Sequence, residues 1–97
     1  MLDRWGPQVS EWRPVRVTGI EEQSAGDELV LYDVSAGQLH HLNPTASAVW
    51  KLCDGTVTLN DIVAEISVQF RLSEADEPAS DVKALLQEWT RAGLINN

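Results

Sequence analysis

The chain has 97 residues and carries 15 acidic and 7 basic side chains, a formal net charge of −8. This length provides one globular domain and excludes a multidomain enzyme. The negative charge repels phosphate groups, which argues against nucleic acid and anionic membranes as partners. The single cysteine, Cys53, excludes a miniprotein built on disulfides. The N-terminus lacks the apolar stretch of a signal peptide, and no apolar run approaches the roughly 18 residues of a membrane span, so we expect a cytoplasmic protein.

The first residues are expected to form an N-terminal arm, residues 1–13, ahead of a domain that covers residues 14–97. The arm contains Trp5 and Trp12, and together with Gly6, Pro7 and Pro14 they follow neither the period of a strand nor that of a helix. Because the burial of an aromatic ring is worth kilocalories, one or both rings are expected to fold back onto the domain. The alternative is an arm that binds a partner or exchanges between two copies of the chain.

Three short strands are predicted in the first part of the domain, near residues 15–18, 28–34 and 38–42, with a polar turn over residues 19–27. The second strand is rich in β-branched and aromatic residues, which suit a pleated surface. A short loop that ends in Gly37 separates it from the third strand, and this spacing is typical of a tight hairpin.

Three helices are predicted next, near residues 44–53, 58–70 and 79–92. Asn43 and Pro44 form a favourable start for the first, and Thr58 with Asp61 resembles a capping box at the second. Gly55 is expected to end the first helix. Each helix has one apolar stripe, and the residues expected to be buried are Trp50, Ile62, Ile66, Leu85 and Trp89. The element order predicts an α+β domain of winged helix-turn-helix type, in which three N-terminal antiparallel strands precede three helices.

No residue pattern points to catalysis or to a metal site. His40 and His41 are adjacent on a predicted strand, so their side chains point to opposite faces and cannot bind one ion together. Cys53 lies on an apolar helix stripe, which indicates a buried side chain. The chain contains neither a Gly-x-Ser-x-Gly motif nor a glycine-rich phosphate loop. We therefore predict a protein that is not an enzyme and that has no cofactor or metal.

Several kinds of partner fit the predicted fold. A winged helix-turn-helix domain is typical of a DNA-binding regulator, but the second helix has no basic residue before Arg71, and the third has only Lys83 and Arg91. A sheet of three strands leaves two edges, and a free edge accepts an extended peptide through main-chain hydrogen bonds. A structural subunit of an enzyme complex, without activity of its own, is the remaining alternative.

A resemblance to a known family is carried by residues 42–55, which run Leu-Asn-Pro-Thr-Ala-Ser-Ala-Val-Trp-Lys-Leu-Cys-Asp-Gly. Residues 81–95 contain the looser run Asp-Val-x-x-Leu-Leu-x-x-Trp-x-x-x-Gly-Leu-Ile, and residues 30–37 form a hairpin of the same kind. Together these segments resemble the PqqD family, small peptide chaperones that are also called RiPP recognition elements. They are especially similar to the relatives encoded beside an HPr-kinase-related protein, and the resemblance covers about residues 28–95.

The resemblance implies a chaperone that captures the leader segment of a ribosomally made precursor peptide by strand addition. The leader would add to the third strand, in a groove bounded by the third helix. The implied peptide-binding residues are Gln38, Leu39, His40, His41, Leu42, Lys83, Leu86, Gln87, Thr90 and Arg91. Depending on the register, either Leu39 and His41 or His40 and Leu42 face the helix. Basic residues on the third helix would favour an acidic leader.

Two partners are implied by the resemblance, the precursor peptide and the modifying enzyme to which the chaperone presents it. The enzyme is expected to be a radical S-adenosylmethionine enzyme or an HPr-kinase-related protein. The N-terminal arm has no counterpart in the family, and it leaves a homodimer open.

Overall fold

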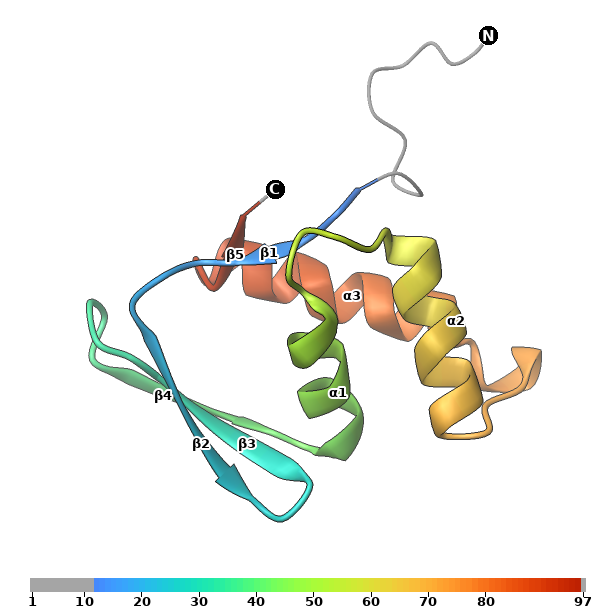
Figure 1. The fold of residues 1–97 in the computed structure, drawn as a ribbon, viewed down its shortest axis with the longest axis horizontal. Helices are drawn as coiled ribbons and strands as arrows, with labels where there is room; N and C mark the ends of the chain where they lie inside the picture. The colour runs from blue at the N-terminus through green and yellow to red at the C-terminus, as the bar shows by residue number, and fades with distance from the viewer. Residues whose placement is uncertain (1–11, 97) are drawn as a thin grey trace, which may run out of the picture.

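Short strands precede the helices in the computed structural model, which describes residues 12–96 (Figure 1). The strands are β1 (Val15–Arg16), β2 (Ile20–Ala25), β3 (Glu28–Asp33), β4 (Gln38–Leu42) and β5 (Ile95–Asn96). The helices are α1 (Pro44–Leu52), α2 (Leu59–Gln69), the 3-10 turn η2 (Glu74–Asp76) and α3 (Pro78–Arg91). The predicted α+β class, with antiparallel strands before three helices, is confirmed. The predicted helix bounds differ from those of α1, α2 and α3 by one residue at most.

The polar stretch after β1 is a strand, so the predicted turn over residues 19–27 is wrong. Ile20–Ala25 pairs along its whole length with β3, and only Gly26 and Asp27 form the turn between them. β2 is an outer strand of the sheet β2-β3-β4, and nearly all of its side chains are exposed. It therefore lacks the apolar alternation by which a strand is recognised in a sequence. Main-chain pairing with β3 holds it in place.

The first predicted strand exists as β1, but it does not belong to the three-stranded sheet. β1 pairs with β5 near the C-terminus in a separate two-stranded sheet. On its other side it contacts the loop after α1, because the Arg16 N–H donates to the Cys53 carbonyl at 3.0 Å. The Gly55 N–H donates in the same way to the Pro14 carbonyl, also at 3.0 Å. Segments from both ends of the domain thus meet beside α1.

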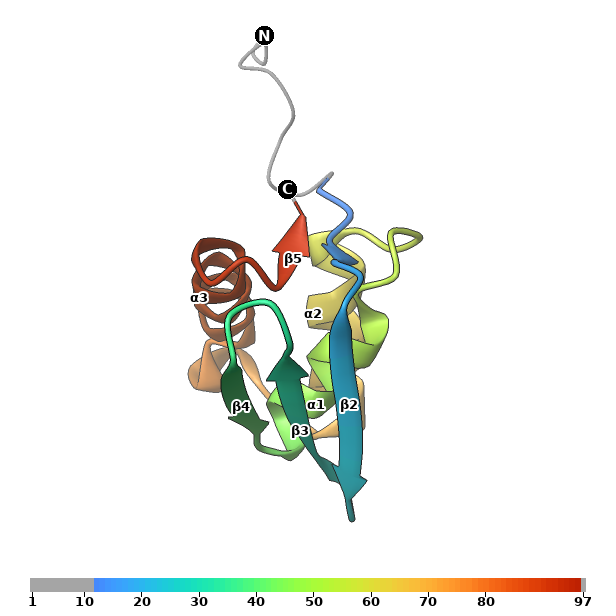
Figure 2. The same cartoon turned by 90° about the vertical axis from the view of Figure 1, so that its left-hand side faces the viewer.

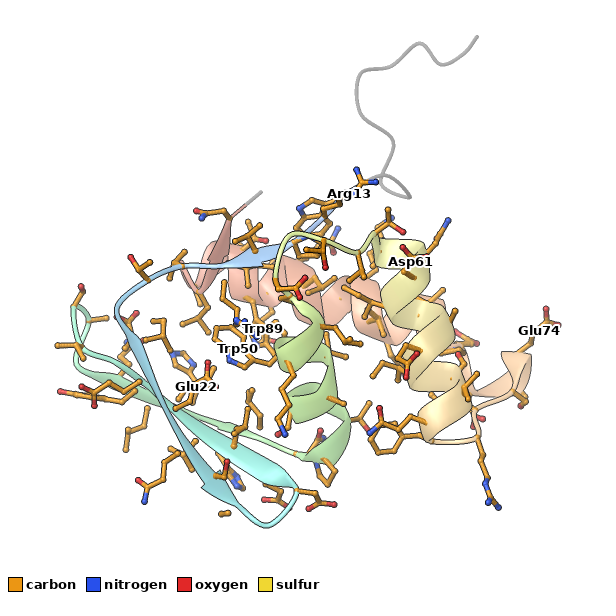
Figure 3. All side chains as sticks on the ribbon, in the orientation of Figure 1. Arg13, Glu22, Trp50, Asp61, Glu74 and Trp89 are labelled. Atoms are coloured by element: carbon orange, nitrogen blue, oxygen red, sulfur yellow. The ribbon has the colours of Figure 1, made fainter. Side chains whose placement is uncertain are left out.

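The centre of the core is formed by two tryptophans from different helices. The ring centroids of Trp50 in α1 and Trp89 in α3 lie 5.4 Å apart with an interplanar angle of 88°, an edge-to-face contact (Figure 3). Four of the five residues predicted to be core are buried, and Leu85 is half-buried. Other buried apolar residues include Leu29, Leu31, Leu42, Val49, Leu59, Val82, Leu86, Leu94 and Ile95. Trp12 packs against this core, whereas Trp5 lies outside the described residues.

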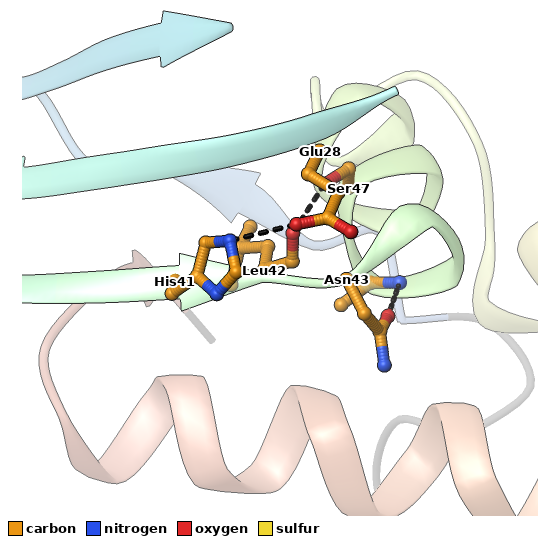
Figure 4. Close-up of polar contacts among 6 residues, drawn as sticks. Glu28, His41, Leu42, Asn43 and Ser47 are labelled. Carbon is orange, nitrogen blue, oxygen red and sulfur yellow. Dashed lines mark hydrogen bonds and ion pairs between the residues drawn. The ribbon is translucent and has the colours of Figure 1, made fainter. Parts of the chain in front are cut away.

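Hydrogen bonds to nearby segments define where α1 begins and ends. The Asn43 Oδ1 accepts a hydrogen bond from the Ala46 N–H at 2.8 Å, which confirms the predicted N-cap (Figure 4). At the other end, the Arg16 guanidinium donates to the carbonyls of Trp50 and Lys51 at 3.0 and 3.2 Å. A cation at this position also complements the negative end of the helix dipole.

The loop after α1 depends on a glycine. α1 ends at Leu52, before the predicted stop at Gly55. Gly55 has a φ of +85°, and a Cβ added there would lie 2.8 Å from Val15 Cγ2. Glycine is therefore needed both for the left-handed backbone and for the close approach of β1. The predicted capping box of Thr58 and Asp61 then begins α2.

The register of the sheet assigns each of its side chains to one face. Residues opposite one another share a face, and successive residues alternate between faces. The rows on one face are Ile20, Asp33 and Gln38; Glu22, Leu31 and His40; and Ser24, Leu29 and Leu42. The rows on the other are Glu21, Tyr32 and Leu39, and Gln23, Val30 and His41. Leu29 and Leu31 are buried while Tyr32 and Leu39 are exposed, so the first face is the inner face, against the helices.

Candidate functional site

β4 forms one edge of the sheet. The strand order is β2-β3-β4, so within residues 12–96 β4 pairs with a strand on one side only. On its other side α3 runs alongside it (Figures 2 and 4). An edge strand presents main-chain N–H and C=O groups to which an extended peptide can bind. The five residues of β4, at about 3.4 Å each, provide about 17 Å of such edge.

The register decides which β4 side chains face the helices. His40 and Leu42 belong to the inner face, and Leu39 and His41 belong to the outer face. Leu42 is buried, whereas Leu39 is 70% exposed. Of the two alternatives left by the sequence, the structure thus selects His40 and Leu42.

The two adjacent histidines lie in different surroundings, as strand geometry predicts. His41 is exposed on the outer face, where its Nε2 lies 2.7 Å from Glu28 Oε1 (Figure 4). His40 is half-buried, and its Nε2 is buried without a hydrogen-bond partner in the described part of the chain. A buried polar atom without a partner costs roughly 1–3 kcal/mol. A polar group that reached this ring nitrogen from a bound molecule would therefore be stabilised.

A hollow of about 300 Å³ lies between the start of α1 and α3. It is lined by Asn43, Thr45, Ala46, Val49, Asp81, Val82 and Leu85. Asn43 directly follows β4, so the hollow begins where the edge strand ends. Val49 and Val82 are buried, whereas Asn43 and Asp81 are exposed. An apolar interior with polar groups around it suits an apolar side chain of a bound peptide.

The α3 residues implied by the family resemblance do not line this hollow. Lys83, Gln87 and Arg91 are exposed. Leu86 is fully buried in the core. Thr90 is half-buried, and its hydroxyl donates to the Leu86 carbonyl at 2.8 Å. The five expected site residues on β4 lie along one edge of the sheet. None of the five expected site residues on α3 lines the hollow at the end of that edge.

Asp81, Val82 and Leu85 are the site candidates that sequence reasoning missed on α3. Asp81 and Leu85 are four residues apart, so they share one flank of the helix, next to the buried stripe. The sequence identifies the stripe through its apolar spacing. It does not identify the flank that faces β4, because that depends on how α3 packs against α1 and α2.

Two observations describe the chemical groups of the domain. Among residues 12–96, no three His, Cys, Asp or Glu side chains are grouped so as to hold a metal ion. Burial raises the pKa of the Cys53 thiol to about 12, so the thiol is protonated near neutral pH and is not an activated nucleophile. It donates to the Val49 carbonyl at 3.3 Å. No helix in the described range is long and apolar enough to cross a membrane.

Comparison with known proteins assigns the family. A solved structure described as TbiB1 in complex with the TbiA(beta) leader peptide is similar, with a TM-score of 0.75 and 18% sequence identity. The match covers 86% of this chain and 95% of that chain, and at this identity it shows a shared fold. No curated protein matches the chain. The family model described as coenzyme PQQ synthesis protein D (PqqD) matches residues 28–95, from β3 to β5. The chain therefore belongs to the PqqD family.

Proposed function

We propose that this protein is a RiPP recognition element, a peptide chaperone that captures the leader segment of a ribosomally made precursor peptide. The leader adds to β4 as a further strand, between β4 and α3. The observation that carries the proposal is the edge of β4, which has no strand partner within residues 12–96 and ends at the hollow between α1 and α3. The chaperone has no catalytic activity of its own and acts in the cytoplasm.

The comparisons support this proposal from two directions. Membership of the PqqD family supports a peptide chaperone. The shared fold with TbiB1, whose structure is described as a complex with a leader peptide, supports a leader as the ligand. The net charge of −8 argues against the alternative of a DNA-binding regulator. The enzyme that receives the peptide is, by family resemblance, a radical S-adenosylmethionine enzyme or an HPr-kinase-related protein.

The proposed site combines the main chain of Gln38–Leu42 with inner-face side chains and with one flank of α3. Main-chain hydrogen bonds along β4 give affinity that does not depend on the peptide sequence, and alternate peptide side chains give specificity. An inward-pointing peptide side chain near Leu42 would enter the hollow. Val82 and Leu85 line the hollow, so an apolar side chain is favoured at this position of the peptide.

The sequence predicted a basic site, in which Lys83 and Arg91 favour an acidic leader, whereas the charge beside the hollow is acidic. Asp81 is the charged residue among those lining the hollow, so a basic or hydrogen-bond-donating side chain is favoured next to the apolar one. Lys83 and Arg91 are exposed, and salt screens their effect on an acidic leader. We therefore place the α3 side of the site at Asp81, Val82 and Leu85.

Amide hydrogen exchange followed by NMR tests the proposal, with a synthetic peptide that matches the leader segment of its precursor. Successive N–H groups of a strand point to alternate edges, so about half of the β4 amides face away from β3. These amides should become protected when the peptide binds. The amides of β2, at the opposite edge of the sheet, are the internal control and should not change. Protection on β2 in place of β4, or shifts confined to the loop between α1 and α2, would contradict the proposal.

A further inference from the structure

The outer face of the sheet is a second surface, which the proposed peptide site does not use. Leu39 and Tyr32 lie opposite each other on this face and are 70% and 38% exposed. A hollow of about 210 Å³ is lined by Glu21, Glu22, Gln23, Val30, Tyr32 and Leu39. This volume is smaller than the roughly 300–1,000 Å³ of small-molecule pockets. It is suited to a single side chain of a protein partner.

The charge of the sheet defines the kind of partner. Residues 20–42 contain no Lys or Arg, and their carboxylates are Glu21, Glu22, Asp27, Glu28 and Asp33. Alternation along β2 and β3 places Glu21 and Glu28 on the outer face. Two copies of this face would bring like charges together, which disfavours self-association. A partner with Lys or Arg around an apolar protrusion is complementary to it.

The size of the face indicates how strongly such a partner binds. Three strands about 4.8 Å apart and about 17 Å long make a face of roughly 250 Å². This is about a third of the roughly 800 Å² that each partner contributes to a standard interface. A peptide added to β4 would extend the same face by one strand. A partner is therefore expected to bind the empty chain weakly and the peptide-loaded chain more tightly.

We infer that the outer face of β2, β3 and β4 docks a protein whose contact surface has apolar side chains surrounded by Lys or Arg. The occupant is the enzyme that receives the peptide, because it alone must contact the peptide strand and the chaperone together. This inference rests on the proposed function.

The test uses the full chain, the leader peptide and the purified enzyme that modifies the same precursor. Tyr32→Thr removes the aromatic side chain that lies opposite Leu39 on β3 but keeps a good strand former, and Glu21→Lys reverses the charge. Each should lower the affinity of the loaded chain for the enzyme about tenfold or more. Both side chains point away from the inner face, so the affinity for the leader peptide alone should stay within about twofold.

Matched control variants come from α2 and η2, which are not part of the sheet. Val68→Thr changes an apolar residue in α2 that is 78% exposed. Glu74→Lys reverses a charge in η2, far from the sheet (Figure 3). Neither should alter enzyme binding. Raising the salt from about 50 mM to about 500 mM should weaken binding of the wild-type chain more than that of Glu21→Lys.

The two proposals fail in different measurements. Equal enzyme affinity for Tyr32→Thr and Val68→Thr would overturn the docking surface, while leader binding would be intact. Absence of leader binding to the wild-type chain, measured without enzyme, would overturn the proposed function. A dimer of the chain alone that Tyr32→Thr dissociates would show that a second copy occupies the face, and would also overturn the inference.

Discussion

The indole N–H of Trp50 donates to the Glu22 carboxylate at 2.9 Å, which joins α1 to the inner face of β2 (Figure 3). Trp50 is fully buried, so its one polar group needs a partner from within the protein. The partner comes from a strand whose other side chains are mostly exposed. This hydrogen bond therefore gives an otherwise weakly packed edge strand a contact with the core.

Replacement of Glu22 by alanine should lower the free energy of unfolding by about 1–3 kcal/mol, because the buried indole N–H loses its acceptor. Glu22→Gln retains a carbonyl oxygen and should cost less. Glu21→Ala is the matched control, since Glu21 lies next in sequence but points to the outer face. Urea denaturation measures all three variants. Equal stability of Glu22→Ala and Glu21→Ala would show that the hydrogen bond is not stabilising.

Removal of the Trp50 side chain should cost about 3–5 kcal/mol, a large part of the stability of a small domain. The loss comprises the burial of the ring and its edge-to-face contact with Trp89. Val68→Ala, at an exposed position of α2, should stay within about 0.5 kcal/mol of wild type. A denaturant midpoint of Trp50→Ala close to that of Val68→Ala would contradict the described core.

Gly55→Ala should destabilise the fold more than Gly26→Ala. The φ angles are +85° and +67°, so both variants incur about 1–2 kcal/mol for a left-handed backbone. Only at Gly55 does the added Cβ meet another atom, Val15 Cγ2 at 2.8 Å. Combining Gly55→Ala with Val15→Ala removes this contact and should recover the part of the lost stability that the contact causes. A double-mutant cycle without coupling between the two positions would exclude the steric explanation.

Leu85 and Leu86 should separate peptide binding from stability. Leu85 is half-buried and lines the hollow, so Leu85→Ala should weaken leader binding at a smaller cost in stability than Leu86→Ala. Leu86 is fully buried, so Leu86→Ala should lower stability by about 2–5 kcal/mol and leave the affinity of the folded chain unchanged. Calorimetric titration and thermal unfolding measure the two effects. Wild-type affinity for Leu85→Ala would remove the hollow from the proposed site.

Stability should decrease at alkaline pH because of Cys53. Burial raises the pKa of this thiol from 9.0 to about 12. Below about pH 9 the thiol is protonated in both the folded and the unfolded chain, so its ionisation does not lower the free energy of unfolding. Between about pH 9 and about pH 12 only the unfolded thiol ionises, and stability falls as the pH rises. Urea unfolding at about pH 8 and about pH 10 should show a smaller decrease for Cys53→Ala than for wild type. An equal decrease would contradict the shift.

The helices could be predicted closely because their signals lie in adjacent residues. Asn43 caps α1 through the backbone three residues on, and Thr58 with Asp61 does the same for α2. β2 could not be found in this way, because its exposed position left no apolar alternation in the sequence. Its pairing with β3 is a property of two segments together. For the same reason, the β1–β5 pair joins residues too far apart in the chain for periodicity to show it.

By itself the sequence determined the three helices, the β3–β4 hairpin and the resemblance to the PqqD family, since these depend on caps, stripes and motifs within short stretches. Only the tertiary structure decided that His40 and Leu42 face inward, because a shift of one residue in register would have reversed every side chain of β4. It also decided that Asp81 and Leu85 line the hollow beside β4. That choice depends on the rotation of α3 about its axis, which is set by the packing of side chains from α1 and α2 that are distant in sequence.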